Sequence, residues 1–224
     1  SKKESDYLLY EEPLGTVSGV QTQIPVLLSE YQFQSKEDVD AYLELMKTTP
    51  DYFNSMIAFE QEKAQKGLFM ASYTADTVIE QCQAFIDMGD SNYLISTFVD
   101  RIQKLTDLSE SEKSDYIQKN AYMLKTYVLP AYQQLIKTVV ELKDSGKNEE
   151  GLCYLPNGKE YYELTVQAST GSARTVPQLQ KLTKNQMKDD LAAMKAVIGL
   201  TAEQAKETAV MESTDPKEIL NSLS

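Results

Sequence analysis

The side chains that could do chemistry are few in this sequence. It contains no histidine, which excludes Ser-His-Asp and Cys-His catalysis and every His-containing zinc site within these residues. The two cysteines, Cys82 and Cys153, lie too far apart in sequence to form a clustered thiolate metal site. Both have apolar neighbours, so we expect two buried free thiols. A disulfide between them would require an oxidising compartment.

Carboxylates are the remaining candidates for metal binding or acid–base chemistry. They occur as adjacent pairs, at Glu11-Glu12, Glu149-Glu150 and Asp189-Asp190. Neighbouring positions on a helix do not share a face, and no loop has the spacing of a calcium site. We therefore interpret these pairs as solvated surface, with a site built of carboxylates alone as the alternative. The sequence predicts no catalytic residue and no metal ligand.

Tyrosine is abundant, with 14 in the chain. The adjacent pair Tyr161 and Tyr162 lies in a segment predicted to be helical, and a helix can direct only one of two neighbours into the core. The simpler interpretation is one packed and one surface tyrosine. The functional interpretation is a hydroxyl that lines a cleft for a peptide or another substrate, which makes Tyr161 and Tyr162 the candidate site residues.

Composition limits the partners. The chain has 224 residues, 42% of them apolar and 25% charged, as in ordinary globular proteins. Its net charge of −12 argues against binding to nucleic acid or to an anionic membrane surface, and favours solubility or basic ligands. No apolar run reaches the roughly 20 residues of a transmembrane helix.

Hydrophobic periodicity predicts an all-α fold with an irregular N-terminal segment, 1–34, and a single helical domain, 35–224, truncated C-terminally. Within the N-terminal segment, residues 21–25 are expected to be extended, with one helical turn after Pro25. Capping and breaking signals place helix starts at Ser35, Asp51, Thr74, Asn92, Ser109, Asn157, Thr175, Thr201 and Thr214.

The longest predicted helix organises the domain. Its apolar residues keep one stripe across Pro130 at Ile117, Ala121, Leu124, Val128, Tyr132, Leu135, Val139 and Leu142. Proline inside a helix removes a hydrogen bond, so we predict a kink there. After a charged linker, 144–150, Pro156 and Gly158 form a turn. We expect the next helix, with Tyr161, to pack on Leu135, Val139 and Leu142.

Several segments together resemble the bacterial proteins grouped as domain of unknown function 885. The matching segments, in the order and roughly the spacing of that family, are GVQTQIPVLL at 19–28, YQF at 31–33, VLPAY at 128–132, GLCYLPNGKEYY at 151–162 and TVPQL at 175–179. The resemblance implies an α-helical protein related to zinc metallopeptidases, in which two histidines of an H-E-x-x-H helix bind zinc and the glutamate activates water.

The chain departs from that family in having no histidine, so no zinc ligand or catalytic residue carries over. It resembles the helical part that precedes the metal motif, which implies a non-catalytic scaffold and cleft wall. Its partners would be the remainder of the polypeptide and a peptide substrate. Zinc is expected only in a longer parent protein. The alternative is a self-contained acidic binding or structural module without enzymatic activity.

Two further expectations concern the ends of the chain. A self-contained module should bury Ile219, Leu220 and Leu223, whereas a fragment should leave apolar surface exposed. The charged start, Ser1-Lys2-Lys3, suits a trimmed linker as well as a cloning boundary. We therefore favour a lipoprotein parent in the cell envelope over a cytoplasmic one.

Overall fold

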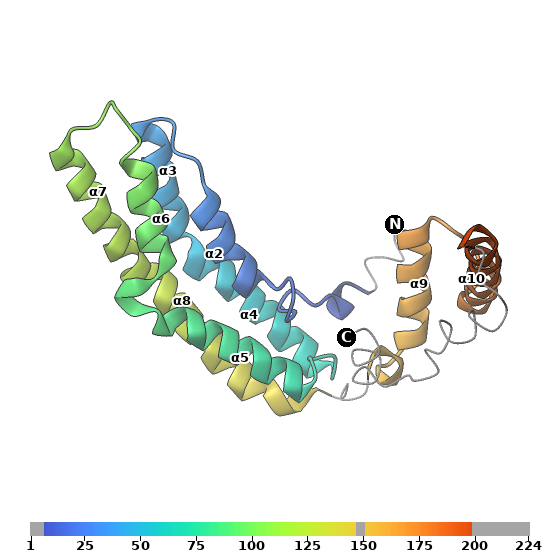
Figure 1. The fold of residues 1–224 in the computed structure, drawn as a ribbon. Helices are drawn as coiled ribbons and strands as arrows, with labels where there is room; N and C mark the ends of the chain where they lie inside the picture. The colour runs from blue at the N-terminus through green and yellow to red at the C-terminus, as the bar shows by residue number, and fades with distance from the viewer. Residues whose placement is uncertain (1–6, 147–150, 199–224) are drawn as a thin grey trace. The chain divides into compact units, whose positions relative to one another are not determined.

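The computed structural model describes residues 7–146 and 151–198. Within these ranges the regular elements are helical and no strand forms, so the predicted all-α class is confirmed. The longer helices (Figure 1) are α2 (Val20–Glu30), α3 (Lys36–Lys47), α4 (Thr49–Gln65), α5 (Ser72–Asp87), α6 (Tyr93–Ile102), α7 (Glu110–Met123), α8 (Leu129–Leu142), α9 (Gly158–Thr170) and α10 (Val176–Ile198).

Local signals account for several helix starts. The Ser35 amide donates to the Asp38 carboxylate at 2.9 Å, and the Ser109 amide donates to the Glu112 carboxylate at 3.0 Å. Both pairs form the capping box expected from the sequence. Asn92 caps α6 by accepting the Leu94 amide at 3.0 Å. Each such cap contributes about 1 kcal/mol to helix stability.

The predicted long helix is present and bent. A π-helical segment, Leu124–Val128, joins α7 to α8 without a break. Pro130 follows directly, in the first turn of α8, where it has no amide hydrogen to donate to the preceding turn. A widened turn before a proline is a known form of helix kink, so the proline-kinked architecture is confirmed.

The two halves of the bent helix organise different neighbours. α7 packs against α3 and α6, whereas α8 packs against α4 and α5; Figure 1 shows α5 and α8 side by side. Tyr132 of α8 lies at the centre of the core, 4.9 Å from the Phe53 ring and 4.5 Å from the Phe85 ring between centroids. Aromatic pairs at this distance contribute about 1 kcal/mol each beyond the burial of their surface.

The N-terminal segment differs from its prediction. Residues 20–30 form helix α2, although residues 21–25 were expected to be extended. Pro25 cannot donate to the carbonyl of Gln21, and the Tyr132 hydroxyl donates to that carbonyl instead, at 2.6 Å. At the other end Arg101 donates to the Leu28 carbonyl at 3.0 Å. The Tyr132 hydroxyl therefore supplies the donor that Pro25 removes, and Arg101 satisfies a carbonyl in the last turn of the helix.

Three smaller predictions were also wrong. Helix α4 begins at Thr49 and not at Asp51, and helix α5 begins at Ser72 and not at Thr74. Cys82 is buried as expected, and burial raises the pKa of its thiol to about 12, but Cys153 is exposed. Cys153 lies in the three-residue 3-10 turn Leu152–Tyr154, none of whose side chains is buried.

The chain divides into two compact units, residues 1–162 and 163–224. The predicted domain boundary at residue 34 stays a prediction. In the second unit, none of the described side chains of α10 is buried. The expected helices from Thr201 and Thr214, the apolar residues Ile219, Leu220 and Leu223, and the pair Glu149-Glu150 lie outside the described residues.

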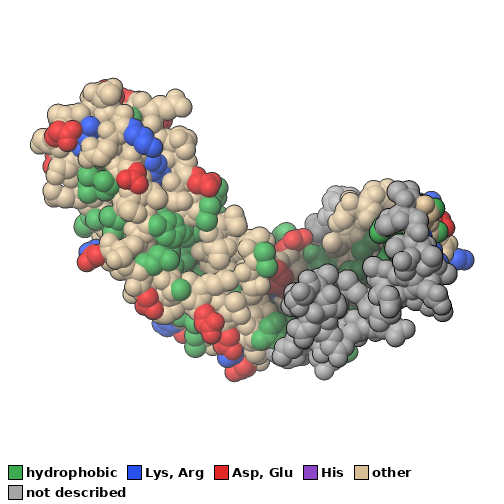
Figure 2. Space-filling model, viewed as in Figure 1, with side chains coloured by type: hydrophobic (Ala, Val, Ile, Leu, Met, Phe, Trp, Pro, Cys, Tyr) green, Lys and Arg blue, Asp and Glu red, His purple; other side chains and the backbone are tan. Residues whose placement is uncertain are grey.

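Charged side chains are spread over the surface of the first unit and do not form one patch on the face shown in Figure 2. On the face shown in Figure 2, acidic side chains lie scattered among hydrophobic and neutral ones. Among the residues that the structure describes, no helix is both long and apolar enough to cross a bilayer.

Candidate functional site

The two predicted site residues lie near the start of α9 and face different surroundings. Tyr161 is half-buried, with its ring centroid 4.9 Å from that of Tyr10 and 5.7 Å from that of Tyr7. Its hydroxyl donates to the Glu11 carboxylate at 3.3 Å. Tyr162 is 50% exposed. Tyr161 thus contacts the N-terminal segment, and Tyr162 is the more exposed of the two side chains.

The Pro-Asn-Gly turn determines where α9 begins. The Pro156 carbonyl accepts a hydrogen bond from the Tyr10 hydroxyl. Asn157 has a positive φ of 52°, a conformation that asparagine tolerates better than most residues. A Cβ added to Gly158 would lie 1.8 Å from the Leu152 carbonyl oxygen, so only glycine fits there. The turn therefore directs Tyr161 toward the N-terminal segment.

The packing partner expected for this helix was wrong. Tyr161 packs against a small apolar cluster of Tyr10, Leu68 and Leu155, not against the C-terminal half of the long helix. Leu135 and Val139 of α8 belong to the main core, where α4 and α5 are their neighbours. With those faces of α8 covered, Tyr161 at the start of α9 packs on the segment that the sequence left irregular.

A buried ionic cluster lies beside this contact. The Lys63 side chain of α4 is completely buried, and its ammonium lies 2.7 Å from the Glu11 carbonyl oxygen, 2.9 Å from the Glu12 carboxylate and 3.7 Å from the Glu60 carboxylate. Glu60 is 1% exposed. Among the described residues, neither of its carboxylate oxygens has a hydrogen-bond partner.

The chemistry of Glu60 follows from this environment. Burial raises the pKa of its carboxyl from 4.5 to about 7, with a smaller contribution in the same direction from the negative charge of Glu12; the nearby Lys63 opposes the rise. The group therefore changes protonation near neutral pH. Because the Glu60 carboxylate is buried, it cannot contact a substrate. We therefore interpret the cluster as a structural contact that fixes the N-terminal segment to α4.

The sequence analysis missed this cluster, although a signal was present. Phe53, Ile57 and Glu60 follow one another at the spacing of a buried helical stripe, and Phe53 and Ile57 are buried. A glutamate on that apolar face indicates either that its carboxylate is buried or that the face has been assigned wrongly. The fully buried Lys63, one turn later, supplies the opposite charge that such a position requires.

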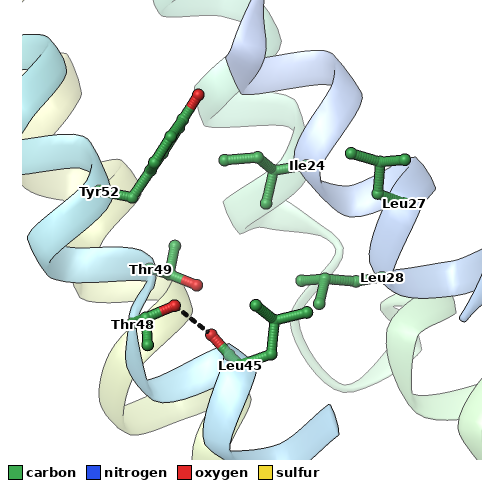
Figure 3. A pocket seen from close by; sticks show the side chains of 7 residues that line it. All are labelled: Ile24, Leu27, Leu28, Leu45, Thr48, Thr49 and Tyr52. Atoms are coloured by element: carbon green, nitrogen blue, oxygen red, sulfur yellow. Dashed lines mark hydrogen bonds between the residues drawn. The ribbon is translucent and has the colours of Figure 1, made fainter.

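A concave apolar site lies elsewhere on the first unit. It is a pocket of about 270 Å³ between α2, the end of α3 and the start of α4 (Figure 3). Its lining residues are Ile24, Leu27, Leu28, Leu45, Thr48, Thr49 and Tyr52. The Thr48 hydroxyl donates to the Leu45 carbonyl at 2.8 Å, whereas Figure 3 shows the Thr49 hydroxyl directed toward the space between the helices.

A second pocket lies in the other unit. It has a volume of about 330 Å³ and is lined by Arg174, Gln178, Lys181, Leu182 and Asn185. Neither of these two pockets includes Tyr161 or Tyr162, so their role in lining a cleft stays a prediction. Within the described ranges, no group of three or more histidine, cysteine, aspartate or glutamate side chains is placed to hold a metal ion.

Comparison with known proteins gives one family and one fold. A family model described as "Bacterial protein of unknown function (DUF885)" matches residues 2–224. No curated protein matches the chain. A crystal structure of a "putative lipoprotein" from Colwellia psychrerythraea superposes with a TM-score of 0.76 at 17% sequence identity, over 92% of this chain and 36% of that one. The chain thus spans about a third of that relative.

Proposed function

Because the chain belongs to the DUF885 family of bacterial proteins of unknown function, we propose that it forms the non-catalytic helical portion of a zinc metallopeptidase-related protein. The observation that carries this proposal is length: the fold accounts for 92% of this chain but only 36% of its structural relative. The absence of histidine from the sequence supports the same division, since H-E-x-x-H zinc sites require two histidines.

In this proposal the 224 residues form the scaffold and part of the wall of a substrate cleft, and they do not perform hydrolysis. The bent helix α7–α8 supplies the rigid scaffold. Tyr162, which is 50% exposed, is the side chain best placed to donate a hydrogen bond to a peptide substrate. Zinc would be held by residues outside this chain, and the partners would be the remainder of the polypeptide and the peptide.

Zinc content and peptidase activity test the proposal. The chain of residues 1–224 and the product of the complete native reading frame are purified, and zinc is measured by elemental analysis. Fluorogenic peptides are then assayed with and without a chelator. We expect zinc and chelator-sensitive hydrolysis only in a longer product. Stoichiometric zinc bound by the 224 residues would contradict the proposal, as would a native reading frame without an H-E-x-x-H segment.

A second candidate function is an acidic helical binding module. The apolar pocket between α2, α3 and α4 favours it, because a concave apolar site with a few polar groups is typical of ligand binding. Binding by the isolated chain, in the absence of any zinc, would distinguish this function from a role confined to the scaffold.

We also propose that the parent protein resides in the cell envelope. The description of the structural relative as a "putative lipoprotein" supports this location. Fractionation of cells that express the complete native gene, with labelled palmitate to detect an acyl anchor, provides the measurement. Recovery of the whole product in the cytoplasm without label would contradict the location and leave the proposal for the helical portion intact.

A further inference from the structure

Residues 7–12, called here the N-terminal arm, are attached to the rest of the first unit at two places. On one side, the Lys63 ammonium of α4 lies 2.7 Å from the Glu11 carbonyl oxygen and 2.9 Å from the Glu12 carboxylate. On the other side, the Tyr10 hydroxyl donates to the turn that precedes α9. Because these three residues of the arm are consecutive, a change at Lys63 reaches the contact with α9 directly.

The ionic cluster beneath the arm contains two carboxylates and one ammonium. The side chains of Lys63 and Glu60 are 0% and 1% exposed, whereas that of Glu12 is 42% exposed. The elements that pack against α4 are the 3-10 turn Leu8–Tyr10, α3, α8 and the π-helical segment. Among the described residues, the charged groups that act on Glu60 are Lys63 of its own helix and Glu12 of the arm. When Glu60 is ionised, the two carboxylates therefore share one ammonium.

The two carboxylates differ in what else can stabilise their charge. Water can solvate Glu12, which is partly exposed. Glu60 is buried and, among the described residues, neither of its oxygens has a hydrogen-bond partner, so its negative charge depends on Lys63 alone. An ionised Glu60 therefore draws the ammonium, which is 3.7 Å away in this structure, toward itself and away from the arm.

The direction of the pH dependence follows from the same burial, which raises the pKa of Glu60 from 4.5 to about 7. An open arm admits water to this carboxyl, and its pKa then returns toward the ordinary value. The closed form thus binds the proton more tightly than the open form does. Closure is most favoured below pH 4.5, and this preference is lost as the pH rises through about 7.

We propose that the N-terminal arm is a pH-sensitive switch, which is closed on α4 and α9 while Glu60 is protonated and opens when Glu60 ionises. Opening uncovers Leu68 and Leu155, which pack against Tyr10 in the closed form. It also removes the ring contact that Tyr10 makes with Tyr161 in the first turn of α9. This inference does not depend on whether the family has hydrolytic activity.

Amide hydrogen exchange of the 224-residue chain at pH 5 and pH 8 tests this switch. The reporters are the amides of Tyr10 and Glu11, which donate within the arm, and that of Tyr161. Protection factors correct for the intrinsic pH dependence of exchange. We expect reporter protection to fall at least tenfold from pH 5 to pH 8 and to be insensitive to dilute urea, as in a local opening. Unchanged protection would overturn the proposal. So would reporters with the same urea dependence as the amides of α5, because the arm would then open only when the whole unit unfolds.

Three variants identify the group responsible. Glu60→Gln should make reporter protection the same at both pH values. Glu62→Gln, which changes an exposed carboxylate of the same helix that pairs with Lys66, should behave as the wild type does. Glu12→Gln removes the carboxylate that the arm places beside Lys63 and should lower reporter protection already at pH 5. A fall from pH 5 to pH 8 that persists in Glu60→Gln would overturn the proposal, as would wild-type protection in Glu12→Gln.

Discussion

Among single residues, Glu60 has the least ordinary environment. A carboxylate that is 1% exposed and has no hydrogen bond among the described residues is unfavourable in its charged form. Lys63 offsets part of this penalty, but its ammonium is closer to Glu12, at 2.9 Å, than to Glu60, at 3.7 Å. The cluster therefore makes stability depend on pH.

Replacement of Glu60 by glutamine should remove that dependence. The folded-state pKa of about 7 lies above the ordinary value of 4.5, so the folded chain binds this proton more tightly than the unfolded chain does. Its contribution to stability is fully present below pH 4.5 and is lost as the pH rises through about 7. We expect Glu60→Gln to raise the unfolding free energy by about 1–3 kcal/mol at pH 8, with little change near pH 4.5.

Thermal unfolding at pH 4.5 and pH 8 measures this effect. The control is Glu62→Gln, which changes an exposed carboxylate of the same helix that pairs with Lys66 at 3.0 Å, and exposed pairs contribute little. Parallel pH profiles for the wild type and Glu60→Gln would show that Glu60 does not titrate in this range.

Replacement of Lys63 should lower the unfolding free energy, whereas replacement of Glu60 should raise it. Lys63→Met removes the only buried cation near Glu60 among the described residues and leaves the Glu11 carbonyl without that donor. We expect a loss of about 3–5 kcal/mol at pH 8, the usual effect of leaving a buried charge without its partner. The double variant Lys63→Met/Glu60→Gln should recover part of this loss. Urea denaturation of the four proteins in the cycle gives the coupling free energy, and strict additivity would rule out a direct interaction.

Among the elements, the start of α9 depends on a close approach of backbone to backbone. The Cβ position of Gly158 lies 1.8 Å from the Leu152 carbonyl oxygen, so a side chain would force the two segments apart. The contacts that follow from this approach include the Tyr10 hydrogen bond to Pro156 and the Tyr10–Tyr161 ring contact. The junction therefore connects the N-terminal segment to the first turn of α9.

Gly158→Ala should loosen that junction. We expect a loss of about 1–3 kcal/mol, the range for overpacking, and faster amide hydrogen exchange around Tyr10 and Tyr161. The matched control is Gly15→Ala, whose Cβ would lie 3.6 Å from the Glu12 carbonyl oxygen, an ordinary van der Waals contact. An effect no larger than that of the control would mean that the turn relaxes without strain.

Over the whole molecule, the described core lies in the first unit. Every buried hydrophobic residue in the described ranges lies at or before Leu155, whereas Leu182, Met187, Leu191 and Met194 of α10 are each at least 44% exposed. Burial of apolar surface supplies most of the free energy of folding. The two units are therefore expected to differ in stability.

Truncation tests that difference. A chain of residues 1–172, which keeps α9 whole, should unfold cooperatively within a few degrees of the full chain, because it retains every buried apolar residue of the described ranges. A chain of residues 1–142 loses Leu155 and Tyr161 and should be less stable. Calorimetry of the three proteins provides the measurement. Loss of a cooperative transition in the 1–172 chain would show that residues after 172 are required for folding.

The sequence by itself determined the features that depend on neighbours within a helical turn. The capping boxes at Ser35 and Ser109, the cap at Asn92 and the kink before Pro130 all occur where the residue types predicted them. The same is true of the all-α class. These features involve groups three or four positions apart, so a single sequence contains both partners of each interaction.

Only the tertiary structure determined the conformation of the N-terminal segment and the residues that meet at the candidate sites. Helix α2 exists around Pro25 because Tyr132, 111 positions away from Gln21, satisfies the carbonyl that the proline leaves open. Tyr10 meets Pro156 across 146 positions. The pocket between α2, α3 and α4 likewise depends on how separate helices pack. A periodic pattern shows which face of a helix is apolar, but it does not show which other face covers it, because that choice depends on the packing of the whole core.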